Sequence, residues 1–301
     1  MPTPPARIPE IQPLLSPNWK DYELIDSGNG LKLERFGRYH LTRPEAEAVW
    51  KPLMPESDWM HTDAVFQPAP EENGGHWQRN SNLPDRWQMQ YGGLRFNVQT
   101  TASRHVGVFL EQACQWDWLT NRIQAAKRPL RVLNLFGYTG IASLAAAQAG
   151  AQVTHVDASH KVITWARENQ ALSGLEDRPI RWIVDDVLKF TQREVRRGTT
   201  YDGIILDPPK FGRGPKGEVW EFYNLLPNLL KTCASLLGKQ PTFILVTAYA
   251  VKASSLTLYY ALDEILRQFS GELSIGEVCL QEKNNKRLLS MAIFARWSSH
   301  S

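Results

Sequence analysis

The chain has 301 residues, 43% of them hydrophobic and 22% charged, so it can build a core and is not a disordered protein. Its 34 basic and 31 acidic residues leave a net charge of only +3, which excludes nucleic-acid binding through overall charge. Binding of a nucleic acid would therefore have to depend on local basic patches. Three distant cysteines without a Cys-x-x-Cys pair argue against a disulfide framework and a zinc site. We find no signal-like start and no apolar run of about 18 residues, and we expect a cytoplasmic protein that contacts no membrane and needs no metal.

The first part of the chain predicts an arm followed by a small β-rich domain. Residues 1–18 are rich in proline, which disfavours a helix, and we expect a flexible arm there. Over 19–119 we predict a β-rich N-terminal domain, because residues 22–41 and 83–99 alternate around glycine turns as hairpins do. Seven of the eleven tryptophans precede position 120. We expect them to fill the core of this domain; the alternative is that a few stack on nucleic-acid bases.

From residue 131 onward, short β-forming runs alternate with helical stretches. The strand candidates are 131–136, 151–157, 180–186, 201–207 and 242–249, and the helix candidates are 141–150, 160–174, 187–198, 219–238 and 254–269. This alternation predicts a parallel sheet covered by helices on both faces. Two closing strand candidates, 273–283 and 288–297, are separated only by NNKR and should pair antiparallel. We therefore predict an α/β catalytic domain over 120–301, with a seven-stranded, mostly parallel sheet whose last strand is antiparallel.

Ligands of such sheets lie at the carboxyl ends of the strands. The first strand candidate ends in a stretch whose two glycines permit a tight turn and close approach of a ligand, and which contains Asn134, Phe136, Gly137, Tyr138, Thr139 and Gly140. It matches neither Gly-x-Gly-x-x-Gly nor a phosphate loop. The second candidate ends in Asp157, Ala158 and Ser159, where a carboxylate can accept hydrogen bonds from ribose hydroxyls. The alternative is that Asp157 only caps the next helix.

The third and fourth strand candidates also end in carboxylates. After the third, we expect Asp186 to accept from an adenine amino group while a backbone N–H at Val187 donates to the ring, with Asp185 as the helix N-cap. The fourth ends in Asp207, Pro208 and Pro209, and because prolines donate no N–H this loop presents only acceptors, which suit ammonium or amino groups. A ligand with ribose, adenine and ammonium but no phosphate is S-adenosylmethionine.

At these motifs the chain resembles the Rossmann-like (class I) S-adenosylmethionine-dependent methyltransferases, and among them the bacterial large-subunit ribosomal RNA methyltransferases. The shared stretches are LNLFGYTG, VDAS, DDVLKF and LDPPKF, within residues 120–301. A further stretch, HVGVFLEQ at 105–112, packs by the cofactor in that family, which implies cofactor contacts for Phe109 and Gln112. In the family an arginine follows this stretch, where this chain has Ala113 and Cys114. The first 100 residues do not resemble the family's usual RNA-binding domain.

The residues favour a nitrogen atom as methyl acceptor. Cytosine-5 methylation needs a cysteine thiolate, which relatives of that kind place after the fifth strand, and this chain has none there. We expect Asp207 and the Pro208 carbonyl to orient an amine, Phe211 to stack on the base, and Lys210 to contact a carbonyl oxygen or a phosphate. Adenine-N6 enzymes usually place the aromatic directly after the prolines. This chain has Lys210 there and Phe211 one position later, so guanine remains an alternative target base.

The basic stretch KFGRGPKG (210–217) extends from this loop, and Lys210, Arg213 and Lys216 are expected near phosphates that flank a target base. We therefore predict a methyltransferase with ribosomal RNA as its partner. Whether KNNKR (283–287) faces the site is left open, and so is the oligomeric state. The alternatives are a methyltransferase acting on a small molecule or protein with the N-terminal domain as a lid, a dinucleotide-dependent oxidoreductase, and a binding module without activity.

Overall fold

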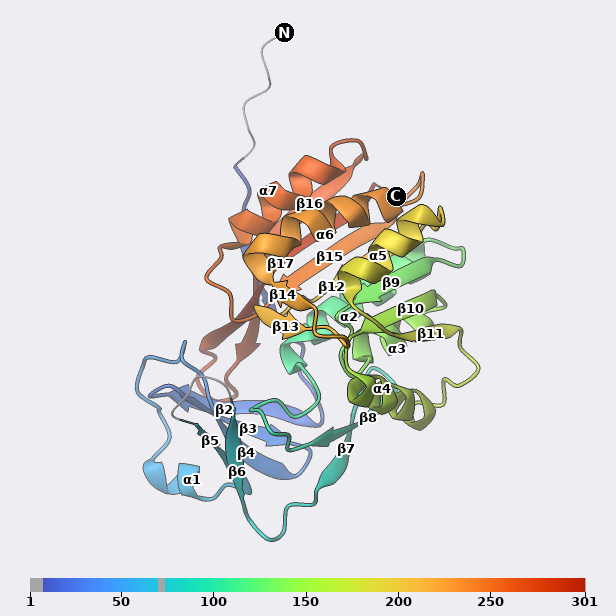
Figure 1. Ribbon diagram of the computed structural model, residues 1–301. Helices are drawn as coiled ribbons and strands as arrows, with labels where there is room; N and C mark the ends of the chain where they lie inside the picture. Colours follow the sequence, from blue (N-terminus) through green and yellow to red (C-terminus); the bar gives the residue numbers. More distant parts are fainter. Residues whose placement is uncertain (1–7, 70–73, 301) are drawn as a thin grey trace.

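The larger lobe of the protein is built on an eight-stranded sheet in the order β1-β16-β17-β15-β12-β9-β10-β11 (Figure 1). The computed structural model describes residues 8–69 and 74–300. The strands are β1 (Ile11–Leu15), β9 (Arg131–Leu135), β10 (Gln152–Asp157), β11 (Ile180–Val184), β12 (Gly203–Leu206), β15 (Phe243–Ala248), β16 (Gly271–Gln281) and β17 (Leu288–Ser299). Only β17 runs against its neighbours, β15 and β16, so the predicted antiparallel last strand is confirmed.

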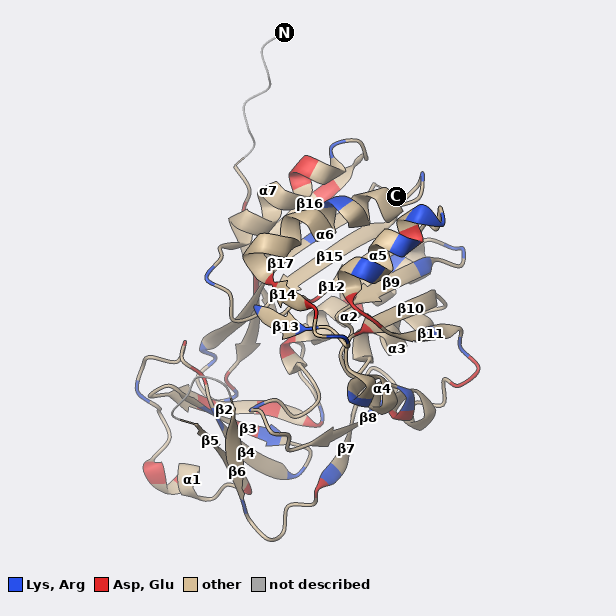
Figure 2. Ribbon diagram, viewed as in Figure 1, with Lys and Arg blue, Asp and Glu red and all other residues tan. Residues whose placement is uncertain are grey.

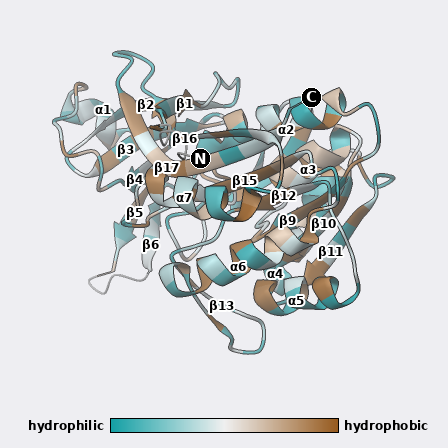
Figure 3. Ribbon diagram, turned by 90° about the horizontal axis from the view of Figure 1, so that it is seen from above, coloured by the Kyte–Doolittle hydropathy of each residue, from teal (hydrophilic) through white to brown (hydrophobic). Residues whose placement is uncertain are grey.

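Helices cover both faces of this sheet. On one face lie α2 (Ala113–Ala125), α3 (Ile141–Gln148) and α4 (His160–Leu172), and on the other α5 (Val187–Arg196), α6 (Phe222–Leu236) and α7 (Ser255–Leu266). Seen from above, α5, α6 and α7 carry both hydrophobic and hydrophilic turns (Figure 3). Strand β12 shows why the sheet is apolar on both sides, since Ile204 and Leu206 pack towards one face and Ile205 towards the other. No helix of residues 8–69 or 74–300 is both long and apolar enough to cross a membrane.

The smaller lobe contains a five-stranded sheet, β2-β3-β4-β5-β6, and a separate hairpin, β7-β8. The bounds are β2 (Tyr22–Gly28), β3 (Leu31–Phe36), β4 (Tyr39–Pro44), α1 (Glu56–Met60), β5 (Ala64–Pro68), β6 (Gly75–Arg79), β7 (Arg86–Tyr91) and β8 (Leu94–Gln99). Both predicted hairpins are confirmed, with turns at Gly28-Asn29-Gly30 and Gly92-Gly93. Of the seven tryptophans before position 120, Trp19, Trp87 and Trp116 are each less than 10% exposed, which supports the core interpretation for these three.

The structure departs from the sequence expectations at the start of the chain and at the domain boundary. Residues 11–15 are not a flexible arm, because they form β1, which pairs in parallel with β16 and raises the strand number from seven to eight. Proline excludes a helix there but not an edge strand. The predicted arm residues 1–7 lie outside the described residues. The expected boundary at 119/120 falls inside α2, which packs beside α3 on the large sheet.

The β16–β17 hairpin joins the two lobes (Figure 1). Its tip contains KNNKR, whose orientation the sequence left open. Lys283 donates its backbone N–H to Leu24 and forms an ion pair with Glu23 of β2, 2.9 Å long. Arg287 lies over the ring of Trp50. These cations therefore hold the lobes together instead of facing the cavity that is described next.

Candidate active site

A cavity of about 390 Å³ lies at the carboxyl ends of the parallel strands. A smaller cavity of about 60 Å³ adjoins it beneath the loop that follows β9. The larger volume is within the range of about 300–1,000 Å³ that is usual for small-molecule sites. The ends of β10, β11, β12 and β15 line it, together with the loop after β9 and residues of the 105–112 stretch.

The loop after β9 is held in an unusual backbone conformation. Phe136 and Tyr138 have φ of 58° and 51°, in the left-handed region that residues other than glycine rarely adopt. The Tyr138 N–H donates to Asp157 Oδ2 at 3.0 Å, and the hydroxyl of Thr139 donates to the Gly107 carbonyl at 2.6 Å. At Gly137 a Cβ atom would lie 2.3 Å from the ring of His155. The surrounding structure therefore fixes a strained loop against the cavity, as is common at functional sites.

Asp157 faces the cavity and organises the loops around it. Its carboxylate accepts hydrogen bonds from the backbone N–H groups of Tyr138 and Ser159, and burial raises its pKa. The N-cap of α4 is Ser159, whose hydroxyl accepts from the Val162 N–H. Asp157 is therefore not the helix cap, which removes that alternative, and its ribose-binding role stays a prediction.

Of the two carboxylates after β11, Asp186 and not Asp185 is the helix cap. Asp186 is the N-cap of α5 and accepts from the Lys189 N–H at 2.9 Å, so the assignment of the cap to Asp185 is wrong. The residue directly before the first helical position is the one that reaches the N–H groups of the first turn. Asp185 forms an ion pair with Arg193 instead. Both Asp186 and Val187 line the cavity, as expected of residues that contact adenine.

Two acidic side chains, Asp207 and Glu111, line the larger cavity together. Burial and the charge of Glu111 raise the pKa of Asp207 to about 7, and burial also raises the pKa of Glu111. Within the described ranges, neither carboxyl forms an ion pair, and Asp207 receives no side-chain hydrogen bond. The charges of Lys32 and Arg43 partly offset the raised pKa of Glu111, whereas no cation of the described residues offsets the raised pKa of Asp207. A largely desolvated carboxyl without a cation is destabilising in its charged form, so Asp207 favours a cationic ligand.

A short hairpin fixes the Asp-Pro-Pro loop beside these carboxyls. It consists of β13 (Phe211–Arg213) and β14 (Val219–Glu221). Trp220 packs on the ring of Phe136 and donates its indole N–H to the Pro209 carbonyl at 2.7 Å. The Lys210 carbonyl accepts from the backbone N–H of Phe222 at the start of α6. Within the part of the chain that the structure describes, no group donates to the Pro208 carbonyl, which remains available to a ligand.

The structure brings most of the predicted residues to the two cavities. Both are lined by Phe109, Gln112, Phe136, Tyr138 and Asp207, the smaller one also by Asn134, Gly137 and Thr139, and the larger one also by Asp157, Ala158, Ser159, Asp186, Val187 and Pro208. Gly140, Lys210 and Phe211 line neither. Gly140 has φ of 87° and is the N-cap of α3, while Phe211 is 53% exposed on the outer face of the hairpin.

Trp220 and Tyr249 also line the larger cavity and were not predicted, and neither was an individual role for His105, Glu111, Pro209, Gly212 or Gly214, which lie in stretches that the sequence did single out. Tyr249 directly follows β15, so the rule that sites form at strand ends could have identified it. No cysteine lines either cavity. Burial raises the pKa of the Cys114 and Cys279 thiols to about 11, so these side chains stay protonated and unreactive at neutral pH.

Comparison with known proteins identifies the chemistry of this fold. A family model described as S-adenosylmethionine-dependent methyltransferase matches residues 63–261. An S-adenosylmethionine-dependent methyltransferase from Agrobacterium tumefaciens, whose crystal structure is known, is 46% identical in sequence to this chain. It superposes with a TM-score of 0.92 and covers 98% of this chain and 97% of that chain. A methyltransferase solved with S-adenosylhomocysteine is 17% identical with a TM-score of 0.71, covers 92% of this chain and 75% of that one, and shares the fold.

Curated relatives match shorter segments. Ribosomal RNA large subunit methyltransferase K/L of Shewanella baltica is 36% identical over 146 residues, which are 46% of this chain and 20% of the relative. Ribosomal RNA large subunit methyltransferase I of Shewanella denitrificans is 36% identical over 126 residues, which are 41% of this chain and 30% of the relative. The chain thus matches less than a third of the length of either relative.

Proposed function

Because the chain belongs to the S-adenosylmethionine-dependent methyltransferase family, we propose that it methylates a nitrogen atom of a base in ribosomal RNA. The observation that carries this proposal is the Asp207 carboxyl beside the free Pro208 carbonyl in a cavity without a cysteine. Two acceptors and no thiol suit an amino or ring nitrogen and not a ring carbon. The ribosomal substrate is supported by the names of the two Shewanella relatives.

The donors and acceptors of the cavity fit S-adenosylmethionine. Asp157 can accept from the ribose hydroxyls and Asp186 from the adenine amino group, while Glu111 and Asp207 provide negative charge for the ammonium and sulfonium. The cofactor supplies an electrophilic methyl group on its sulfonium. Binding of this cation should lower the pKa of Asp207, because the ionised carboxylate then gains an opposite charge that it otherwise lacks.

The residues of this chain contribute orientation and a proton acceptor to the transfer. Methyl transfer is an in-line displacement, in which positioning of the nucleophile supplies much of the rate. Asp207 and the Pro208 carbonyl accept hydrogen bonds from the acceptor nitrogen and aim its lone pair. Asp207, which the bound cation keeps ionised, can also take up the proton that this nitrogen loses. Trp220 keeps the loop in place through the Pro209 carbonyl.

Cations at the mouth of the cavity support a nucleic-acid substrate. Acidic and basic residues are otherwise interspersed over both lobes (Figure 2). Arg213 lines the cavity, and Lys210, Arg213 and Lys216 form no ion pair among the residues that the structure describes. Phe211 is 53% exposed beside them, with the Arg213 guanidinium 6.0 Å from its ring centroid. We propose that these cations contact phosphates and that Phe211 stacks on a base next to the target.

Mass spectrometry of ribosomal RNA nucleosides from a strain without this chain tests the proposal. One methylated nucleoside should be missing, and the purified protein should restore it on the deletion-strain RNA with S-adenosylmethionine. If the nucleosides are unchanged and only small molecules or proteins accept the methyl group, then the RNA assignment is wrong and the N-terminal domain is better explained as a substrate lid.

RNA binding by purified protein gives a second test. Replacing Lys210, Arg213 and Lys216 by glutamate should reduce the salt dependence of the RNA affinity by about two in log–log slope, because each lost phosphate contact contributes about 0.7. Glutamate at the exposed Arg196, Lys231 and Arg267 serves as a charge-matched control that should change the slope much less. Equal effects of the two triple variants would contradict a phosphate-binding mouth.

A further inference from the structure

The part of the cavity beyond the predicted ribose residue is lined by Tyr249 and His105. The predicted ribose residue Asp157 ends β10, and Tyr249 follows β15, three strands away in the order β15-β12-β9-β10. Adjacent strands are about 4.8 Å apart, so the ends of β10 and β15 are separated by about 14 Å. Asp207, at the end of β12, lies between them. Tyr249 is therefore on the side of Asp207 away from the predicted ribose position, which leaves this side of the cavity for a methyl acceptor.

Tyr249 belongs to an aromatic wall of the cavity. Its ring centroid is 5.9 Å from that of His105 and 6.0 Å from that of Phe109, and Phe109 continues the wall to Tyr138. The next residue, Ala250, has φ of 56°, a left-handed conformation that turns the chain away directly after the tyrosine. Burial raises the pKa of Tyr249 to about 12, so its ring is neutral at physiological pH. A neutral, fixed aromatic ring is a suitable surface for stacking a base.

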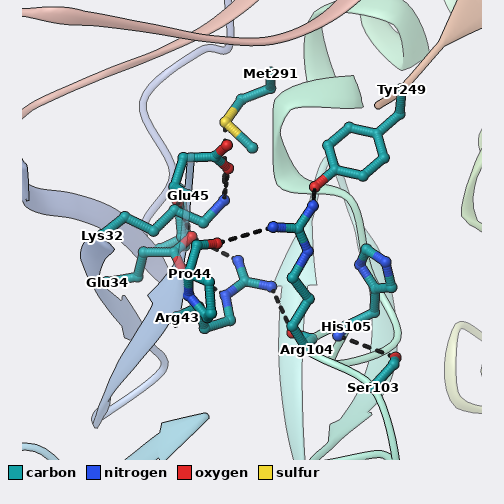
Figure 4. A network of polar contacts seen from close by, with 11 residues as sticks. Lys32, Glu34, Arg43, Pro44, Glu45, Ser103, Arg104, His105, Tyr249 and Met291 are labelled. Carbon is teal, nitrogen blue, oxygen red and sulfur yellow. Dashed lines mark hydrogen bonds and ion pairs between the residues drawn. The ribbon is translucent and has the colours of Figure 1, made fainter. Parts of the chain in front are cut away.

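Arg104 holds this ring from the other lobe (Figure 4). Its guanidinium donates to the Tyr249 hydroxyl and to the carbonyl of Pro44, the last residue of β4, at 3.0 Å. The guanidinium carbon is also 5.3 Å from the centroid of the Tyr249 ring. No carboxylate of the described ranges forms an ion pair with Arg104. Arg104 therefore connects the N-terminal sheet to the end of β15, and no carboxylate of the described residues neutralises its charge.

A buried charge cluster in the N-terminal sheet fixes Arg104 in turn. Arg43 of β4 donates to the Arg104 carbonyl at 3.1 Å and forms two hydrogen bonds with the buried Glu34 of β3, 2.6 and 2.7 Å long. Glu34 also accepts from the hydroxyl of Tyr22 at 2.7 Å. Breaking such a buried pair is strongly destabilising, so this cluster is a rigid support. The position of Tyr249 therefore depends on the N-terminal sheet.

We propose that the acceptor base stacks on Tyr249 and that Arg104 is the positioning residue that couples the N-terminal domain to this acceptor site. The inference rests on the proposed function and adds to it the surface that receives the planar base. It also gives the N-terminal domain a part in the acceptor site beyond that of a lid. The predicted ribose residue Asp157 and the acceptor residue Tyr249 then occupy opposite sides of Asp207.

Methyl transfer from labelled S-adenosylmethionine to deletion-strain ribosomal RNA tests the stacking role. Tyr249→Leu should lower kcat/KM for RNA roughly 5- to 150-fold, as expected for the loss of one base–aromatic stack. Tyr249→Phe should retain most of the stacking. The affinity for S-adenosylhomocysteine, measured by calorimetry, should stay within about twofold in both variants, because the ring contacts the acceptor side. Tyr260→Leu, at a tyrosine that is 60% exposed on α7, is the matched control.

A double-mutant cycle tests the positioning role. Arg104→Met should raise KM for RNA at least about fivefold, since two charge-assisted hydrogen bonds are lost. Arg104→Lys, which keeps one donor, should recover part of this effect. In the Tyr249→Phe background the effect of Arg104→Met should shrink, because coupled residues are not additive. Arg267→Met, on a side chain that is 73% exposed, controls for the loss of a charge.

The outcomes separate this inference from the proposed function. A wild-type protein that methylates no RNA overturns both. An active wild type with unchanged kcat/KM in Tyr249→Leu overturns the inference alone, as does an equal loss of S-adenosylhomocysteine affinity in that variant. Fully additive effects of Arg104→Met and Tyr249→Phe would show that Arg104 does not act through the tyrosine. Thermal unfolding of every variant excludes a general loss of the fold as the cause.

Discussion

Replacing Asp207 by asparagine should stabilise the ligand-free protein at alkaline pH while it abolishes methyl transfer. Burial and the charge of Glu111 raise the pKa of Asp207 from 3.8 to about 7 in the folded protein. Folding then favours the protonated carboxyl, so the stabilisation is complete below the unfolded-state pKa and is lost as the pH rises through about 7. At about 1.4 kcal/mol per pKa unit, the charged carboxylate costs at most about 4 kcal/mol at alkaline pH.

Urea unfolding over a series of pH values measures this effect. Near about pH 8, Asp207→Asn should raise the free energy of unfolding by about 2–4 kcal/mol over wild type, and the gain should shrink towards about pH 4. Asp263→Asn, at a carboxyl that is 41% exposed on α7, should change stability by no more than about 0.5 kcal/mol at any pH. If Asp207→Asn is no more stable than wild type at alkaline pH, then Asp207 is not a buried charge without compensation, and the reasoning is refuted.

Three further predictions concern the cofactor site and its loop. Gly137→Ala should abolish S-adenosylhomocysteine binding in calorimetry because its Cβ would lie 2.3 Å from the His155 ring, and adding His155→Ala should restore part of the binding. Affinity for S-adenosylmethionine should fall about tenfold per pH unit below about pH 7, because protonated Asp207 cannot neutralise a cation; a flat profile in calorimetry would contradict this. Trp220→Phe should lower kcat roughly three- to tenfold through loss of the 2.7 Å bond to Pro209, and an unchanged kcat would remove its role in holding the loop.

Much of the fold follows from local patterns in the chain. The alternation of short apolar runs and helical stretches predicts the parallel strands, and the short NNKR connection predicts the antiparallel β17. The glycine turns predict the two N-terminal hairpins. Each of these signals arises from neighbouring residues, because turn chemistry and hydrophobic periodicity act over a few positions. Edge strand β1 carries no such signal, because Pro13 interrupts its short run and its pairing partner β16 lies more than 250 residues further along the chain.

The candidate site likewise has features that local sequence patterns predict and features that depend on the folded structure. Strand ends predict where Asp157, Asp186 and Asp207 meet, because parallel strands bring their carboxyl ends to one edge. The choice of Asp186 over Asp185 as the helix cap depends on the local backbone geometry at the start of α5. The exposed position of Phe211 follows from the pairing of β13 with β14, which turns Trp220 towards the cavity instead.

The amino-acid sequence by itself determined the alternation of strands and helices, the chemistry at the strand ends and the kind of ligand that these ends can hold. Only the tertiary structure decided that Glu111 lies beside Asp207, and that Arg104 reaches Tyr249 although 145 positions separate them. The physical reason is the range of the forces involved. Periodicity and capping depend on residues within one or two turns, whereas the environment of a buried charge depends on every segment that packs around it.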